Sequence, residues 1–202
     1  MGKRIGIMGG TFDPIHIGHL VIAEYAYEQF QLEEVMFMPS ANPPHKFSIH
    51  TNQEQRKEMI MCGIEDNPHF SLSLIEYERK GMTYTVDTLC ELSSLYPHNK
   101  YFFIIGADSF YQLEKWHKPE VLFQYAHFLV ATRNGQTYDI MEEHKKKLEK
   151  KYGAKINFLY VPALEISSSE IRRRIGEGKS TTYFLTEKVM KYIEDNGLYL
   201  KD

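Results

Sequence analysis

Two histidines near the amino terminus are placed where their side chains could bind phosphate. His16 and His19 belong to GGTFDPIHIGH, residues 9–19, which follows the apolar run RIGIM and precedes the helix-like pattern LVIAEYAYEQF. Gly9 and Gly10 allow a ligand to approach the backbone closely. A helix that begins near His16 offers free N–H groups to an anion, and both imidazoles share one face of its first turn. The stretch is therefore suited to hold a polyphosphate.

This stretch matches neither of the two commonest nucleotide-binding motifs. Its glycines do not fit G-x-G-x-x-G, and it lacks the lysine of G-x-x-x-x-G-K-[ST]. A His-x-x-His pair can also bind zinc, but no third ligand with recognisable metal spacing is nearby. Two structural histidines satisfied by backbone groups are the plainer alternative. No resident metal site is predicted.

A second informative stretch is EISSSEIRRRI, residues 165–175. Ser167 and Glu170 fit a capping box, so the serines could simply start a helix. The same turn also offers hydroxyls, free N–H groups and a cluster of arginines at 172–174. The arginines fan around more than half a helical turn, so one or two could face a pocket while the rest face solvent.

Two further stretches each carry an open choice. SANPPHK, residues 40–46, ends on the positive charge of Lys46 but could be an ordinary exposed loop. In IIGADSF, residues 104–110, Asp108 either caps a helix or accepts from a ribose or a base. Trp116, the only tryptophan, is either a ring-stacking platform or a core anchor.

Short apolar runs alternate with helical patterns along the chain. Strands are predicted at residues 4–8, 34–39, 70–74, 101–106, 127–132 and 156–161. Helices are predicted at residues 17–30, 51–66, 84–95, 118–125, 139–153 and 186–196. The alternation predicts an α/β fold, doubly wound, with a mostly parallel sheet flanked by helices. The loops that follow the strands would then converge at one edge of the sheet, forming a nucleotide site with room for two ligands.

Composition limits the classes to which the chain can belong. Its 202 residues, 43% hydrophobic and 25% charged, predict a single domain over 1–202 with a small C-terminal helical part at about 163–202. A net charge of −3 argues against a general nucleic-acid binder. No apolar run approaches membrane-spanning length. Cys62 and Cys90 are expected to be buried reduced thiols, which predicts a cytoplasmic protein.

Taken together, GGTFDPIHIGH and ISSSEIR resemble the HxGH-type nucleotidyltransferase superfamily. PPHK, YTVDT at 84–88, IIGADS and the pair Trp116–His117 look like those of the bacterial nicotinate mononucleotide adenylyltransferases, and the similarity runs essentially along the whole chain. Other members, such as pantetheine-phosphate adenylyltransferase, share the two superfamily motifs but are usually shorter. The resemblance implies a Rossmann-like nucleotidyltransferase fold. It also implies transfer of AMP from ATP to nicotinate mononucleotide, a step of NAD biosynthesis that yields nicotinate adenine dinucleotide and pyrophosphate.

The resemblance also implies roles for individual residues. Contacts to ATP are expected from Gly9, Gly10, Thr11, Phe12, His16, His19, Gly106, Asp108, Arg133, Ser168 and Arg172. Among these, His16, His19 and Arg172 are the expected catalytic residues. Contacts to the mononucleotide are expected from Asn42, Lys46, Thr85 and Trp116.

The chemistry of such a transfer can be argued without the family. The nucleophile is a 5′-phosphate whose second pKa is about 6, so it is mostly dianionic at pH 7 and needs no general base. Catalysis then consists of positioning plus electrostatic stabilisation. Mg²⁺ is expected on the triphosphate. Because the sequence shows no acidic pair dedicated to it, the metal is expected to arrive with ATP and keep several waters.

Several alternatives stay open on sequence alone. The acceptor could be pantetheine phosphate or nicotinamide mononucleotide, and the scaffold could be a non-catalytic nucleotide sensor. A plain structural α/β domain would leave the coincidence of the four loops unexplained. The oligomeric state is open as well, a homodimer being one alternative.

Overall fold

A computed structural model describes residues 2–42, 49–79, 81–133 and 138–200, with the side chains of Arg133 and Tyr138 outside the described part. Within these ranges the strands are β1 (Arg4–Gly10), β2 (Glu34–Pro39), β3 (Phe70–Leu72), β4 (Lys100–Gly106), β5 (Ala126–Arg133) and β6 (Lys155–Val161). The helices are α1 (Ile17–Gln29), α2 (Gln53–Ile64), α3 (Thr85–Leu95), α4 (Ala107–Phe110), η1 (Leu113–Lys115), α5 (Pro119–Tyr125), α6 (Tyr138–Tyr152), α7 (Ser168–Gly176) and α8 (Glu187–Asp195).

The strands form one sheet in the order β3-β2-β1-β4-β5-β6, with every neighbouring pair parallel. The chain runs outward from β1 to β3 and then returns to place β4 beside β1, so the strand order reverses between β1 and β4. The predicted doubly wound α/β fold is confirmed. Each predicted strand is present, although β3 ends at Leu72, two residues before the predicted end.

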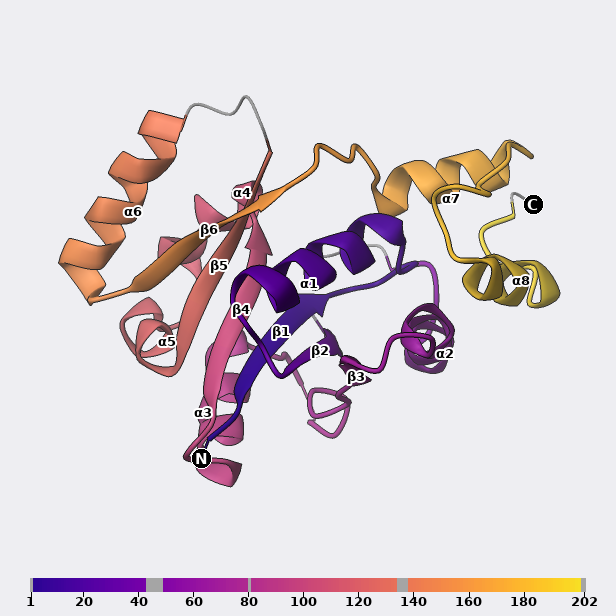
Figure 1. Ribbon diagram of the computed structural model, residues 1–202. Coiled ribbons are helices and arrows are strands. Elements are labelled where there is room, and N and C mark those ends of the chain that lie inside the picture. The colour runs from indigo at the N-terminus through magenta and orange to yellow at the C-terminus, as the bar shows by residue number, and fades with distance from the viewer. Residues whose placement is uncertain (1, 43–48, 80, 134–137, 201–202) are drawn as a thin grey trace.

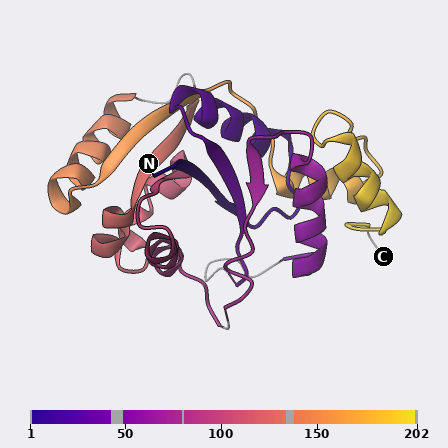
Figure 2. The same ribbon diagram turned by 60° about the horizontal axis from the view of Figure 1, so that its bottom comes forward.

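Helices cover both faces of the sheet (Figures 1 and 2). In β4, Phe102 and Ile104 pack in the core shared with α1 and α2, whereas Phe103 and Ile105 pack in the core shared with α3 and α5. Successive side chains of a strand point to opposite faces. An apolar run without polar alternation therefore supplies side chains to two cores at once. Such a run is what a parallel strand covered by helices on both faces requires.

The C-terminal helices α7 and α8 lie at the end of the molecule away from α6, and α8 packs against α2 (Figure 1). Ile171, Val189 and Ile193 are buried in the same core as α1 and α2. Thr186 caps α8 by accepting from the Val189 N–H at 3.4 Å. The helical part is therefore attached to one face of the sheet through a continuous apolar contact.

Two details of the fold bear on the sequence-based expectations. Cys62 and Cys90 are free, as expected, but only partly buried. They lie on α2 and α3, each at the margin of a core rather than inside it. None of the described helices is long and apolar enough to cross a membrane.

Candidate active site

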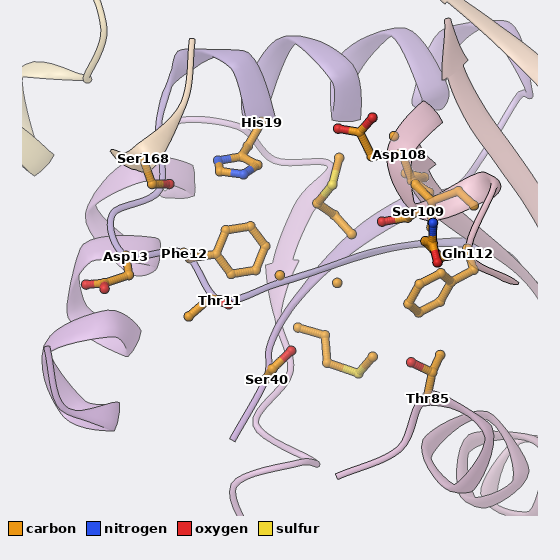
Figure 3. A pocket seen from close by; sticks show the side chains of 18 of the residues that line it. Thr11, Phe12, Asp13, His19, Ser40, Thr85, Asp108, Ser109, Gln112 and Ser168 are labelled. Carbon is orange, nitrogen blue, oxygen red and sulfur yellow. The ribbon is translucent and has the colours of Figure 1, made fainter. Parts of the chain in front are cut away.

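A cavity of about 1340 Å³ opens at the carboxyl ends of β1 and β4, where the strand order reverses. The loop after β1, the first turn of α1 and the start of α7 form one end of it. The start of α3 together with the α4–η1 segment forms the other. Figure 3 shows this arrangement, with His19, Phe12 and Ser168 at one end and Thr85, Ser109 and Gln112 at the other. The cavity is the switch-point crevice where open α/β sheets bind ligands.

Most of the predicted site residues line this cavity: Gly9, Gly10, Thr11, Phe12, His16, His19, Thr85, Gly106, Asp108, Trp116, Ser168 and Arg172. Asn42 does not, because its side-chain amide donates to the Gly81 carbonyl at 3.0 Å. Lys46 and the Arg133 side chain lie outside the described part of the chain. Residues spread over most of the sequence are thus brought together around one space.

The two glycines that end β1 are required by close packing. A Cβ on Gly9 would come within 2.9 Å of the Phe103 ring, and one on Gly10 within 3.0 Å of the Phe12 ring. Phe12 itself has a positive φ of 51° and is buried. A left-handed conformation is strained for a bulky residue, so the surrounding packing must hold it. Its ring lies edge-on to His19, with 5.1 Å between the ring centroids.

His16 and His19 form a stacked pair, with 3.7 Å between ring centroids and 24° between their planes. His16 is the N-cap residue of α1, and its backbone N–H donates to Nδ1 of His19 at 3.3 Å. Because Nδ1 accepts, a neutral His19 ring carries its proton on Nε2. His16 is 7% exposed. Burial lowers its pKa to about 4, opposed in part by a backbone hydrogen bond, so His16 is neutral at pH 7 and lines the cavity as a dipole rather than as a charge.

The start of α7 is joined to the loop after β1, although more than 150 residues separate them in sequence. Arg172 donates from Nη1 to the Asp13 carbonyl at 2.6 Å, and Ser168 donates from Oγ to the Pro14 carbonyl at 2.8 Å. Ser167 caps the helix by accepting from the Glu170 N–H at 3.2 Å. The capping and the docking functions are therefore divided between neighbouring serines.

The three arginines of α7 have different surroundings. Arg172 faces the cavity, whereas Arg173 pairs with Glu170 and Glu177 on the exposed side of the helix. Arg174 donates to the Ser180 carbonyl and lies over the Phe184 ring. Because the Glu170 carboxylate pairs with Arg173, the predicted capping box is only half formed.

Asp13 links three parts of the chain, a role that sequence reasoning missed. The carboxylate is 3% exposed. It accepts from the His50 N–H at 2.8 Å, the Thr51 hydroxyl at 2.7 Å and the Tyr199 hydroxyl at 2.8 Å. Burial and the nearby carboxylate raise the pKa of Tyr199, so its hydroxyl stays protonated and donates. In the sequence, the aspartate before a proline signalled only a turn.

Aromatic rings and a helix start make up the far end of the cavity. Trp116 meets Phe103 edge-on at 6.1 Å and 89° while still lining the cavity, so it is both anchored and available for stacking. Tyr84 stacks on His117 at 4.3 Å. Tyr84 is also the N-cap residue of α3 and makes no side-chain capping bond, which leaves the first turn at Thr85 without a side-chain acceptor.

The α4–η1 segment corrects one expectation and adds residues to the site. Asp108 is not a helix cap: Gly106 holds that position, and Asp108 is the second residue of α4. Its side chain lines the cavity (Figure 3), a position compatible with the other predicted role, acceptance from a ribose or a base. Gln112 and Lys115 also line the cavity. Gln112 and Lys115 follow Asp108 by four and seven residues. This helical spacing is the sequence pattern from which they could have been predicted.

Glu76 is a buried acid in the wall of the cavity, with 5% of its surface exposed. It accepts from the Thr88 hydroxyl at 3.1 Å, and Arg79 donates to the same hydroxyl at 2.8 Å. These bonds connect the segment after β3 to α3. No sequence motif marked Glu76.

No group of three or more histidine, cysteine, aspartate or glutamate side chains in the described ranges is arranged to hold a metal ion. The cavity instead combines backbone N–H groups, two imidazoles, hydroxyls and the Arg172 guanidinium at one end. This donor set suits phosphate oxygens rather than a metal.

Comparison of the sequence with known families and proteins gives consistent results. Residues 7–174 match the cytidylyltransferase-like family model. The chain is 48% identical over 199 residues to the probable nicotinate-nucleotide adenylyltransferase of Lachnoclostridium phytofermentans, covering 98% of this chain and 100% of that protein. It is 45% identical to a protein of the same name from Desulfitobacterium hafniense, covering 98% and 96%.

Solved structures share the fold. The nicotinic acid mononucleotide adenylyltransferase of Plasmodium falciparum, complexed with NaAD, superposes with a TM-score of 0.80 at 24% identity, covering 98% of this chain and 97% of that one. The same protein complexed with APC gives a TM-score of 0.77. The match extends over both the sheet and the C-terminal helices.

Proposed function

This chain belongs to the nicotinate-nucleotide adenylyltransferases of the cytidylyltransferase-like family, and from this premise we propose that it transfers AMP from ATP to nicotinate mononucleotide. The products are nicotinate adenine dinucleotide and pyrophosphate, which makes the reaction a step of NAD biosynthesis. We propose a direct in-line attack without a covalent intermediate.

The observation that carries the proposal is a single cavity with chemically different ends. One end offers anion donors at the starts of α1 and α7, and the other offers Trp116 and the uncapped start of α3. A volume of about 1340 Å³ is above the range of a typical single-ligand site. A triphosphate and a ring-bearing mononucleotide fit these two ends.

The triphosphate would lie between α1 and α7. His19 would donate from Nε2, the start of α1 would contribute N–H groups and dipole, and Arg172 would form charged hydrogen bonds to the phosphates. The guanidinium of Arg172 binds the Asp13 carbonyl in the described structure. When the phosphates bind, Arg172 would either keep its bond to the Asp13 carbonyl or exchange it for a bond to a phosphate oxygen. Both partners would be within its reach, because Asp13 and Arg172 line the same cavity.

The attacking group would be the 5′-phosphate of the mononucleotide. It is mostly ionised at pH 7, so the protein needs no base and works by alignment and charge stabilisation. Because His16 is neutral at pH 7, it could donate or accept a hydrogen bond but would contribute no net charge to binding the phosphates. The leaving pyrophosphate would be stabilised by Arg172 and the donors at the start of α1.

Mg²⁺ would enter bound to the triphosphate. The described residues offer no cluster of metal ligands, and magnesium commonly keeps several waters and binds through substrate phosphates. When bound it would neutralise part of the charge on the leaving group. Asp108, which lines the cavity, would be the nearby carboxylate available to a metal-bound water or to a ribose hydroxyl.

The pyridine ring would stack near Trp116, and its carboxylate would meet the N–H groups at the start of α3. A negative charge is favoured at a helix N-terminus. Tyr84 supplies no side-chain capping bond, so it does not compete for the amides at Thr85 and Val86. This arrangement favours the acid over the amide.

The decisive experiment is a steady-state comparison of nicotinate mononucleotide, nicotinamide mononucleotide and pantetheine phosphate, each with ATP and Mg²⁺, following pyrophosphate release. We expect the highest kcat/KM with nicotinate mononucleotide, because a site built for a charged group discriminates against an analogue lacking it. Faster turnover with another acceptor would reassign the substrate. Absence of pyrophosphate release with all three would favour the nucleotide-sensor alternative.

Two further aspects accompany this proposal. A cytoplasmic location suits the free, half-buried thiols of Cys62 and Cys90, which a reducing compartment would keep unpaired. A homodimer is compatible with the reaction, and size-exclusion chromatography with light scattering would test it.

A further inference from the structure

Arg56 carries a positive charge that is buried under the edge of the cavity. It is 1% exposed, and no charged side chain in the described ranges is more buried. It lies on the inner face of α2 together with Met59, Ile60 and Ile64. The positions of a helix that face the core are normally apolar. An arginine at such a position therefore requires a physical reason.

The Arg56 guanidinium joins the carboxyl ends of two neighbouring strands. Its Nη1 donates to the Thr11 carbonyl at 3.0 Å and to the Ser40 carbonyl at 2.7 Å. Thr11 directly follows β1, Ser40 directly follows β2, and both line the cavity. The Ser40 N–H also donates to the Gly10 carbonyl at 2.8 Å. One side chain therefore fixes the spacing of two cavity walls.

Among the described residues, no acid neutralises the charge of Arg56. No carboxylate of those residues pairs with it, and its Nε is buried without a hydrogen-bond partner among them. The Tyr77 ring lies 5.4 Å from the guanidinium carbon. Burying a cation in this way is costly, and its field acts on the adjoining space more strongly than a surface charge would.

We propose that Arg56 is a positioning residue for the adenylyl transfer. It holds the loop after β1, where the triphosphate would bind, in register with Ser40 at the end of β2, which lines the same cavity. Its uncompensated charge also favours a site where two anions must meet. Because in-line attack depends on the alignment of the two phosphates, the spacing that Arg56 sets should affect turnover more than binding. This inference rests on the proposed function.

A matched control exists at the opposite end of β1. Arg4 donates to the Phe30 carbonyl from Nε at 3.2 Å and from Nη2 at 2.7 Å, and its guanidinium lies 4.6 Å from the Phe102 ring centroid. Arg4 thus has the same kinds of contact as Arg56, carbonyls and an aromatic ring. It lies at the amino end of the strand, outside the residues that line the cavity.

The test compares Arg56→Met with Arg4→Met, measuring kcat, the KM of each substrate and the melting temperature. For folded Arg56→Met we expect kcat to fall by about 10- to 100-fold, the range expected for a small misplacement of reacting groups, with each KM changing by less than about threefold. Arg4→Met should lose thermal stability while kcat stays within about twofold. A wild-type kcat in folded Arg56→Met would overturn the inference, as would an equal loss of kcat in Arg4→Met.

Arg56→Lys keeps the test decisive if Arg56→Met fails to fold. Lysine retains the charge, but its side chain is one atom shorter than that of arginine, so its ammonium does not reach the position of Nη1, from which both carbonyls are bonded. We expect kcat to fall at least about fivefold, by part of the same misplacement, and full activity would overturn the inference. The wild-type enzyme in the same assay separates the two proposals: if it forms no dinucleotide the proposed function fails, whereas an active wild type with an equally active Arg56 variant refutes only the role of Arg56.

Discussion

The two ends of the cavity are built in different ways. The triphosphate end consists of two compact segments, the loop after β1 and the start of α7, tied to each other through Arg172 and Ser168. The acceptor end is assembled from separate segments joined by ring contacts, with Trp116 edge-on to Phe103 and Tyr84 stacked on His117. The first end is fastened by direct hydrogen bonds between its two segments, whereas the second combines aromatic contacts with the hydrogen bonds around Glu76.

This difference suggests a division of labour. Donors that are fixed before the substrate arrives need no reorganisation when charge develops, so the triphosphate end should govern turnover. A ring platform and a helix start contribute mostly to binding and selectivity, so the acceptor end should govern the KM of the mononucleotide. Substitutions at the two ends should therefore affect different kinetic constants.

The largest effect is expected at His19. His19→Ala should lower kcat by about 10²- to 10³-fold, the usual loss when one fixed transition-state donor is removed. Circular dichroism and a thermal melt would verify that the variant is folded. A folded variant with a near-normal rate would remove His19 from the mechanism and weaken the distinction between the two ends.

His16 should make the triphosphate end sensitive to acid. Its pKa is about 4 in the folded protein and 6.5 in the reference state. Between about pH 6.5 and pH 4, His16 binds a proton in the unfolded chain but not in the folded chain. The free energy of unfolding therefore falls as the pH falls through this range, and His16 has no effect on it above about pH 7. The full loss near pH 4 would be about 3 kcal/mol.

Urea unfolding of the wild type and His16→Gln at several pH values would measure this contribution. The variant should lack this part of the pH dependence, so the difference between the two proteins should shrink toward low pH. Parallel curves for wild type and variant would show that His16 is not the group responsible.

A smaller effect, confined to one substrate, is expected at the acceptor end. Trp116→Ala should raise the KM of nicotinate mononucleotide by about tenfold, since stacking on an aromatic ring contributes about 1–3 kcal/mol per base. The KM of ATP should stay unchanged. Tyr183→Ala, which removes a ring that is 89% exposed, is the control for a general effect of losing an aromatic residue. Equal increases in both KM values would contradict the division between the two ends.

The smallest effect is expected at Arg173, next to Arg172 in the sequence. Its side chain is 50% exposed and pairs with Glu170 and Glu177 on the surface. Exposed ion pairs contribute little, so Arg173→Ala should leave kcat and both KM values within about twofold. Arg172→Ala, measured in parallel, should lower turnover strongly. Similar losses in the two variants would mean that the whole arginine cluster acts on the phosphates.

Most of the fold and much of the site could be predicted from the sequence. The apolar runs correctly placed every strand of the sheet, because buried parallel strands need side chains that suit both faces. The histidine and serine motifs meet at one end of the cavity, as predicted, because a strand–turn–helix segment largely specifies its own geometry. For Asp108 the structure places the side chain on the cavity wall and excludes helix capping, one of the two roles considered.

The residues that sequence reasoning missed share a cause. Asp13, Arg56 and Glu76 are buried charged groups whose partners lie far away in the chain: Tyr199 for Asp13, and Thr11 and Ser40 for Arg56. Arg56 occupied a core position in the helical period, which was a usable signal. No periodicity marks the partners of Asp13 or Glu76.

The sequence by itself determined the order of the elements, the doubly wound class and the two motifs that line one end of the cavity, because these depend on local periodicity, turn chemistry and helix starts. Only the tertiary structure decided which serine docks on Pro14, which arginine faces the cavity, and that a buried guanidinium bridges the ends of β1 and β2. Such bonds are made between segments brought together by packing. Their geometry is set by the whole sheet rather than by any short stretch of chain.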